Sequence, residues 1–195
     1  QIGNFDYIDP KMSKHLWLYE GVTEYFANLI LLQPNIITDR EFFTQRIRNK
    51  ISSSSRYPEK KISFTDMSQR VFEKKYGQHY YQVYQRGAII GLLLDIEIIR
   101  LTNGQKTLKD VVLELSNKYG SERSFNEETF FDEFTALVHP DLRQWFADYV
   151  EGTVPLDIRG GLSQIGVNYS KKGKHLVPKR IFRDYGTKSY FLSMG

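Results

Sequence analysis

The stretch from Tyr80 to Leu101 constrains the fold of this chain more than any other part. It reads YYQVYQRGAIIGLLLDIEIIRL, and a helix of this sequence has apolar residues on nearly every face. A helix without a polar face has to be buried, so we expect it at the centre of a helical domain. Gly87, Ala88 and Gly91 form a small-residue face next to Tyr84. Residues this small let another backbone approach closely.

The surrounding sequence also has the signals of helices. Apolar spacing predicts a helix over about 13–33, which Pro34 and Asn35 end. Thr38 followed by Glu41 predicts a capping box at the start of a second helix. Further helices are expected to begin near Thr65, Thr107, Asn126 and Pro140, the last one ending near Glu151-Gly152. Residues 52–64, with four consecutive serines, predict a surface loop that could border a cleft.

The sequence therefore predicts a mainly α fold. We expect a bundle-like helical lobe over residues 1–152 and a short β or irregular tail over 153–195. In that tail, glycines separate short apolar runs, a pattern that favours short strands and turns.

Composition and charge exclude several classes of function. The chain has 195 residues, of which 41% are hydrophobic and 14% aromatic, enough for a packed core. No apolar run is long enough to span a membrane. The absence of cysteine excludes disulfides, thiolate metal sites and cysteine nucleophiles. Of the basic residues, seven fall in 170–195 against one acidic residue. No recognised nucleic-acid motif accompanies them, so we predict a solvated face or linker and no nucleic-acid partner.

The stretch Leu16–Phe26, LWLYEGVTEYF, holds the candidate site. Glu20 and Glu24 are four residues apart in an apolar and aromatic run, so in a helix both carboxylates lie on one face. Burying an unpartnered carboxylate costs several kcal/mol, and this pair therefore needs a cation nearby. The alternative is a half-exposed amphipathic helix whose acidic side chains face water. The pattern alone does not decide between the two.

WLYEGVTEYF resembles the segment that carries the third zinc ligand in gluzincin metallopeptidases, and it is most similar to the glycyl aminopeptidase family. It is also close to the WLNEG segment of aminopeptidase N and its relatives. The resemblance implies that Glu20 is a zinc ligand. It also implies that Glu24 stands where thermolysin-like enzymes keep an acid that hydrogen-bonds a zinc-bound histidine, a common arrangement around metals.

VYQRGA, at residues 83–88, resembles the Tyr-x-Lys-Gly-Ala segment of glycyl aminopeptidases and the aminopeptidase N group. There the tyrosine hydrogen-bonds the tetrahedral oxyanion beside the zinc, so the resemblance assigns this catalytic role to Tyr84. A neutral phenol in a dry pocket can stabilise such a transition state by roughly 3 kcal/mol. The alternative is a core tyrosine whose hydroxyl is satisfied elsewhere. Arg86 replaces the usual lysine.

The sequence has no HExxH, and no two of its four histidines, His15, His79, His139 and His175, are four residues apart. His15 is expected on the solvent side or at the helix start. We therefore expect the chain to be the C-terminal half of a thermolysin-like catalytic domain. Zinc and its two histidines would then belong to the full-length protein, in an N-terminal lobe that acts as partner to this chain. Alone, the chain is expected to lack catalytic zinc and peptidase activity.

The expected parent protein is a zinc metallopeptidase, with an aminopeptidase as the closest resemblance and a peptide as substrate. In that family a PDZ domain commonly follows the catalytic lobe, and the tail of this chain would lead towards it. The resemblance would also suit a bacterial periplasm or cell envelope, although no residue pattern decides the compartment. A non-catalytic helical interaction module, or a degenerate peptidase homologue, remains the alternative. In that case Glu20, Glu24 and Tyr84 would be dispersed or engaged in core contacts.

Overall fold

The computed structural model describes residues 8, 10, 12–120, 123–169 and 176–178. The described part is mainly helical, as the sequence predicts. Its elements in chain order are η2 (Trp17–Val22), α1 (Thr23–Leu29), η3 (Ile30–Asn35), α2 (Asp39–Glu41), η4 (Phe42–Ile47), α3 (Arg48–Ser54), α4 (Phe64–Gln69), α5 (Lys74–Gly77), α6 (Gln82–Leu101), α7 (Leu108–Lys118), α8 (Phe130–Ala136), α9 (Leu142–Tyr149), α10 (Ile158–Gln164), β1 (Val167–Tyr169) and β2 (Leu176–Pro178). The η2 and η4 segments are π-helical, and η3 is a 3₁₀-helix.

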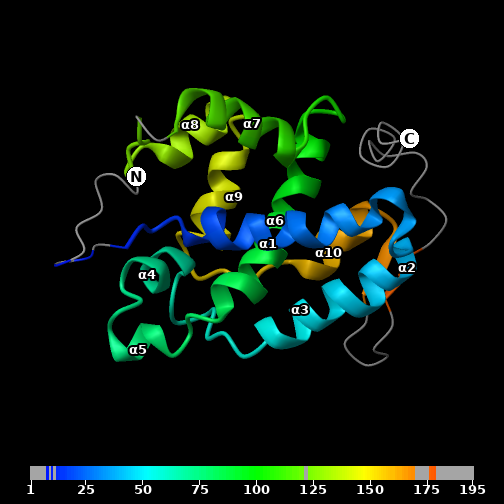
Figure 1. Ribbon diagram of the computed structural model, residues 1–195, viewed down its shortest axis with the longest axis horizontal. Coiled ribbons are helices and arrows are strands. Elements are labelled where there is room, and N and C mark those ends of the chain that lie inside the picture. The colour runs from blue at the N-terminus through cyan, green and yellow to red at the C-terminus, as the bar shows by residue number, and fades with distance from the viewer. Residues whose placement is uncertain (1–7, 9, 11, 121–122, 170–175, 179–195) are drawn as a thin grey trace.

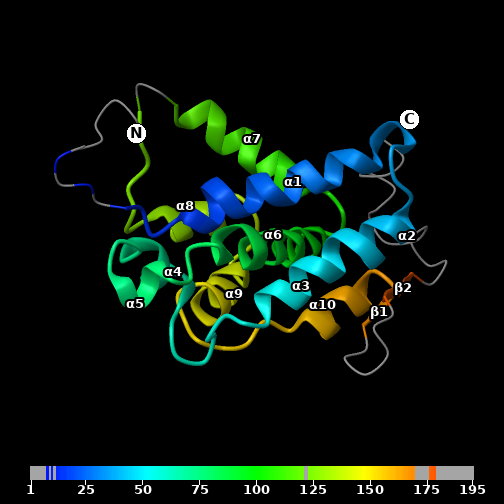
Figure 2. The same ribbon diagram turned by 60° about the horizontal axis from the view of Figure 1, so that its bottom comes forward.

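The central position of α6 is confirmed. It lies in the middle of the molecule, and η2, α1, α3, α7, α9 and α10 all pack against it (Figures 1 and 2). Fifteen of its twenty residues are buried. Its one buried carboxylate, Asp95, accepts hydrogen bonds from the Tyr25 hydroxyl at 2.6 Å and from the Leu108 backbone N–H at 2.8 Å. Asp95 therefore ties α1 and the start of α7 to the central helix.

The first predicted helix is present as a continuous helical run, but it changes type twice. It passes from π-helix in η2 to α-helix in α1 and to 3₁₀-helix in η3, which continues through Asn35. The capping box at the next helix is confirmed, because the Glu41 N–H donates to Thr38 Oγ1 at 3.2 Å and the Thr38 N–H donates to Glu41 Oε2 at 2.9 Å. Helices η4 and α3 then continue to Ser54.

The predicted surface loop over 52–64 is only partly correct. Ser52, Ser53 and Ser54 belong to α3, and Ser54 is buried with its hydroxyl donating to the Ile51 carbonyl at 3.0 Å. Beyond the helix, Tyr57 is buried and its hydroxyl donates to the Ser63 carbonyl at 2.8 Å. The serine run suggested a loop, but serine hydroxyls can bond back to the helix, and the apolar stripe of α3 keeps this turn helical.

Two later elements also differ from expectation. Asn126 does not cap α8, which begins at Phe130; its side chain instead accepts the Glu128 N–H at 2.8 Å in a preceding turn. After Gly152 the sequence predicted strands and turns, and β1 pairs with β2 in antiparallel fashion. However, α10 precedes them, with the Asp157 side chain accepting the Gly160 N–H at 2.8 Å at its start. An N-cap of this kind stabilises the start of a helix, and here the helix forms although its sequence contains two glycines.

The predicted boundary near residue 152 stays a prediction, and α10 on its C-terminal side packs against α6. The basic residues predicted to lie on a solvated tail fall outside the described residues. Within the described part of the chain, no helix combines the length and apolar character that a membrane span requires.

Candidate active site

Two glycines bring the two sequence motifs together. Gly21 of η2 and Gly87 of α6 touch backbone to backbone: a Cβ at Gly21 would lie 2.6 Å from the Gly87 Cα, and one at Gly87 would lie 2.7 Å from the Gly21 Cα. Real Cβ atoms do not approach other atoms this closely. Any larger residue at either position would therefore push η2 away from α6. The close approach that the small-residue face predicted is confirmed.

This contact brings the Glu20 carboxylate beside the Tyr84 hydroxyl. Glu20 precedes Gly21 in η2, and Tyr84 lies one turn before Gly87 in α6. The Glu20 carboxylate lies near enough to the Tyr84 hydroxyl to raise its pKa, and both residues are partly exposed. Glu20 and Tyr84 are sixty-four positions apart in the sequence, so the structure brings together two groups that the sequence could pair only through the resemblance.

Two further tyrosines surround the Tyr84 ring. Tyr80 meets it edge-on with ring centroids 6.0 Å apart, and Tyr81 lies 6.5 Å away. A hydrogen bond with Tyr80 is the largest cause that raises the pKa of the Tyr84 hydroxyl above its ordinary value, and burial and the Glu20 carboxylate raise it further. Tyr84 is therefore a neutral phenol at physiological pH. A neutral phenol can donate a hydrogen bond to a developing negative charge.

Glu24 has partners that the sequence did not reveal. Its carboxylate forms an ion pair with Lys50 of α3, and its Oε1 accepts a hydrogen bond from Asn28 Nδ2 at 3.1 Å. The Lys50 side chain is 12% exposed and that of Glu24 31%, so the pair is partly shielded from water. Lys50 supplies the cation that a carboxylate in this apolar run needs. Asn28 follows Glu24 at helical i+4 spacing, a signal the sequence does contain, whereas Lys50 comes from a separate helix.

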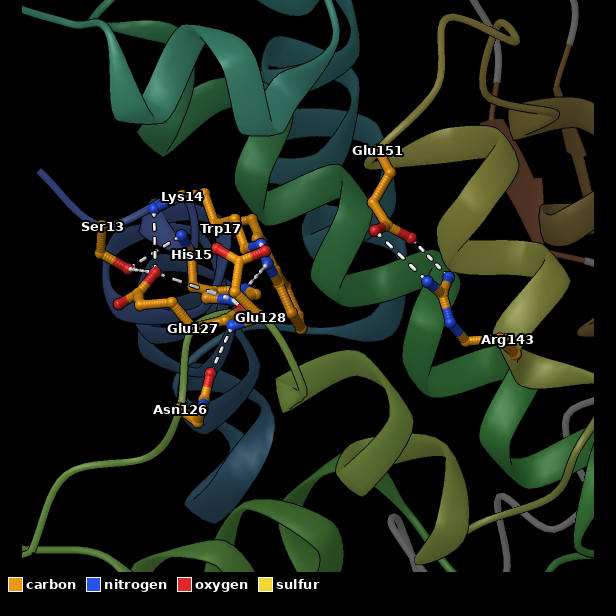
Figure 3. A network of polar contacts seen from close by, with 9 residues as sticks. All are labelled: Ser13, Lys14, His15, Trp17, Asn126, Glu127, Glu128, Arg143 and Glu151. Carbon is orange, nitrogen blue, oxygen red and sulfur yellow. Dashed lines mark hydrogen bonds and ion pairs between the residues drawn. The ribbon is translucent and has the colours of Figure 1, made fainter.

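The start of η2 is anchored by a buried network around His15 (Figure 3). The Trp17 indole N–H donates to His15 Nδ1 at 3.1 Å, and His15 Nε2 lies 3.0 Å from the Glu127 carbonyl. An indole only donates, so Nδ1 accepts, and the proton of the neutral ring is on Nε2. His15 is at the helix start, as expected, but the expected solvent-side position is wrong because it is fully buried.

Trp17 itself fixes η2 against the opposite side of the lobe. It is completely buried and stacks on Phe131 with ring centroids 5.9 Å apart and an interplanar angle of 10°. Phe134 and Phe146 also contact its ring, at 6.1 and 5.5 Å. Aromatic contacts of this kind hold a helix in one position, and they place Glu20, three residues further on, with it.

Arg86, two residues after Tyr84, is buried. Its Nη1 donates to Glu59 Oε2 at 2.7 Å, and its guanidinium carbon lies 5.1 Å from the centre of the Tyr57 ring. Burial lowers the pKa of Arg86, and the Glu59 charge and hydrogen bond oppose that shift. Arg86 therefore links α6 to the segment between α3 and α4. The sequence marked Arg86 as a departure from the family pattern but contained no signal for its partner Glu59.

The described residues do not form a complete metal site. In the part of the chain that the structure describes, no group of three or more His, Cys, Asp or Glu side chains could hold a metal ion. A catalytic zinc needs three protein ligands and an open position. The zinc site expected from the resemblance would therefore need ligands from elsewhere. Of the three predicted site residues, Glu20 and Tyr84 are adjacent, and Glu24 contacts Lys50 and Asn28.

The chain is similar to known proteins in fold and in part of its sequence. The chain is similar in structure to an aminopeptidase N family protein from Idiomarina loihiensis, with a TM-score of 0.75 and 22% sequence identity, and the match covers 86% of this chain and 30% of that one. At this identity the likeness establishes the fold. The chain thus corresponds to less than a third of that protein. No curated protein matches the chain significantly. Residues 1–90 match the family model of the M61 glycyl aminopeptidases. This range contains Glu20, Glu24 and Tyr84, so the part of the chain that holds the candidate site is similar to the M61 glycyl aminopeptidase family.

Proposed function

We propose that this chain is the helical lobe of a zinc-dependent metallopeptidase, an aminopeptidase, that hydrolyses peptide bonds. The observation that carries the proposal is the Gly21–Gly87 contact, which brings Glu20 beside Tyr84. The family match over residues 1–90 supports it, because that range contains both motifs. A carboxylate beside a tyrosine would by itself be weak support for the proposal. Here a backbone contact places the two groups, and both lie in the segment that matches the family model, so the support is stronger.

Each site residue has one proposed role. Glu20 would be one oxygen ligand of the zinc, with the two histidines coming from an HExxH segment that residues 1–195 do not contain. Tyr84 would donate a hydrogen bond from its hydroxyl to the oxyanion of the tetrahedral intermediate, and its raised pKa keeps that hydroxyl protonated. Glu24 would accept the N–H of a zinc-bound histidine. Both of its described hydrogen-bonding contacts end on Oε1, so Oε2 can serve this purpose.

The test is peptide hydrolysis by the complete protein that carries this chain. Tyr84→Phe removes only the hydroxyl, and we expect kcat to fall by about 10²- to 10³-fold, the usual cost of losing one oxyanion donor. The matched control is Tyr81→Phe, because this exposed neighbour loses the same atom without a proposed role. Unchanged kcat in Tyr84→Phe would contradict the oxyanion role.

Two further measurements separate the parts of the proposal. In the complete protein, Glu20→Gln should lower both zinc content and turnover, because an amide is a weaker zinc ligand than a carboxylate. The isolated 195-residue chain with added zinc should show no turnover. Zinc-dependent hydrolysis by that isolated chain would show that the site is complete within these residues and would overturn the lobe interpretation. Normal folding with no effect of either substitution would favour an interaction module instead.

A further inference from the structure

We propose that a cleft between α6, α9 and α10 binds a small organic cation, an ammonium or guanidinium group on an apolar body. The cleft has a volume of about 420 Å³, which is within the range of pockets that hold small ligands, roughly 300–1,000 Å³. Its walls include Leu93, Glu97, Arg100, Trp145, Tyr149 and Asp157. This cleft is independent of the proposed peptidase function.

The cleft is separate from the Glu20–Tyr84 pair. Tyr84 is on the first turn of α6, and Leu93, the first wall residue on that helix, follows nine positions later. A helix rises 1.5 Å per residue, so about 13 Å of helix axis lies between them. The wall residues that α6 contributes, Leu93, Glu97 and Arg100, all lie on its C-terminal half, and Tyr84 is not among the residues that line the cleft.

One wall of the cleft is aromatic. Trp145 and Tyr149 are four residues apart on α9, and their ring centroids lie 5.3 Å apart at 61°. Both side chains are only partly buried, so they have ring surface to offer a ligand. Aromatic faces attract cations, tryptophan most strongly, with interaction free energies of about 0.5–1 kcal/mol at exposed sites. The apolar body of the ligand would pack on the same rings and on Leu93.

The charges around this wall favour a positive ligand. Asp157 lies at the cleft with its Oδ1 accepting the Gly160 N–H at 2.8 Å. Glu97 also lies there, but Arg100 pairs with it through two hydrogen bonds of 2.9 and 2.6 Å. The Glu97–Arg100 pair carries no net charge, so it does not neutralise the negative charge of Asp157. Burial raises the pKa of Tyr149, and the nearby carboxylates of Asp157, Asp148 and Glu97 raise it further, consistent with a negative local potential.

Part of the cleft lining is closely packed. Gly161 of α10 lies against Leu93 of α6, and a Cβ at Gly161 would be 2.5 Å from the Leu93 Cδ2 atom. The two helices are therefore held close together at this point, and α10 keeps a fixed place beside α6. A site formed by packed helices keeps its shape before the ligand arrives, which lowers the entropy cost of binding.

The experiment is an NMR titration of the 195-residue chain with 2-phenylethylammonium. The chain has two tryptophans, Trp17 and Trp145, so it has two indole N–H signals, and Trp145→Phe assigns them. We expect the Trp145 signal to shift saturably while the Trp17 signal, from a completely buried ring, stays in place. The matched anion 3-phenylpropionate has the same ring and should produce at least ten-fold weaker binding.

Asp157→Asn tests the charge. Asparagine is also a good N-cap, so α10 should remain folded, and affinity for the cation should fall about five-fold, the effect expected for one nearby charge in water. Glu128→Gln, which removes one negative charge from an exposed site paired with Lys14, should leave the affinity unchanged. The proposal is overturned if the anion binds as well as the cation, if Trp145 shows no saturable shift, or if Asp157→Asn and Glu128→Gln behave alike.

Discussion

At the scale of single residues, the missing side chains of Gly21 and Gly87 decide the geometry of the candidate site. Their backbones meet at a separation that no Cβ could occupy, and Glu20 and Tyr84 are placed by that contact. The neighbouring glycine Gly91 faces Tyr25 less tightly, since a Cβ there would lie 3.0 Å from the Tyr25 Cβ. Among these three glycines, the tightest contact therefore falls directly beside Glu20.

Gly21→Ala should destabilise the protein and separate the site residues. The added methyl group would overpack a backbone contact, which typically costs about 1–3 kcal/mol. We expect the free energy of unfolding in urea to fall by about 2 kcal/mol. Gly120→Ala is the matched control, because a Cβ at Gly120 would have no atom within 4 Å. A Gly21→Ala protein as stable as Gly120→Ala would contradict the close contact.

His15 should make stability depend on pH. Burial lowers the pKa of His15 below its ordinary value of 6.5, while the Glu127 carbonyl and the charges of Glu127 and Glu151 oppose the shift and Lys14 adds to it. In the folded state the ring therefore stays neutral at pH values where the unfolded chain takes up a proton. Protonation then favours unfolding. The stability linked to His15 is fully present above about pH 7.5 and is lost as pH falls through 6.5.

This dependence can be measured by urea unfolding between pH 8 and pH 5. The free energy of unfolding should decrease by up to about 1.4 kcal/mol per pH unit below 6.5, since one extra proton binds to the unfolded state. His15→Asn keeps an acceptor for the Trp17 indole N–H but cannot titrate. It should be less stable at pH 8 and should lack the His15 part of the slope. Equal slopes in the two proteins would contradict the buried neutral ring.

At the scale of elements, the strongly patterned helices were predictable and the connections were not. The central helix followed from an apolar run with no polar face, and the helix start at Thr38 followed from the predicted capping box, which the structure contains. A helix was also expected to begin near Thr107, where the structure has a second capping box. The segment after α3 was misread because its serines and charges suggested solvent, whereas Tyr57 and Ile62 are buried. Single apolar residues in a connection have no periodicity that could reveal their burial.

The ion pair between Arg86 and Glu59 should hold that connection to α6. The Arg86 side chain is 5% exposed and that of Glu59 32%, so removing the carboxylate leaves a buried cation with poorer compensation. Glu59→Gln should lower the free energy of unfolding by about 2 kcal/mol, below the usual 3–5 kcal/mol for a fully buried pair because Glu59 is partly solvated. Glu73→Gln, which breaks the exposed pair with Arg70, should have a much smaller effect.

A double substitution tests whether this loss comes from the stranded charge. Arg86→Met fills similar space without a cation, so adding it to Glu59→Gln should restore part of the stability. Replacing a buried ion pair by apolar groups of similar volume is often close to neutral. If the double variant loses more free energy of unfolding than the two single variants lose together, the buried charge is not the cause of the loss.

At the scale of the whole molecule, the sequence predicted the mainly helical lobe and two neighbouring members of the candidate site. Glu20 and Tyr84 could be proposed because each has a short family-like motif around it. The partners of these and neighbouring residues had no motif that could reveal them: Lys50 pairs with Glu24, Glu59 pairs with Arg86, and Tyr80 contacts the Tyr84 ring. The buried position of His15 was equally hidden, because its partner Glu127 is more than a hundred residues away in sequence.

The central claim is that Glu20 and Tyr84 face one reaction centre in a metallopeptidase. The most direct measurement is a crystal structure of the complete protein with zinc, located by anomalous scattering, and a phosphinate peptide analogue. The account predicts a Glu20 oxygen about 2.0–2.2 Å from the zinc. It also predicts the Tyr84 hydroxyl at about 2.6–3.2 Å from a phosphinate oxygen. A metal bound without Glu20, or a Tyr84 hydroxyl directed away from the analogue, would contradict it.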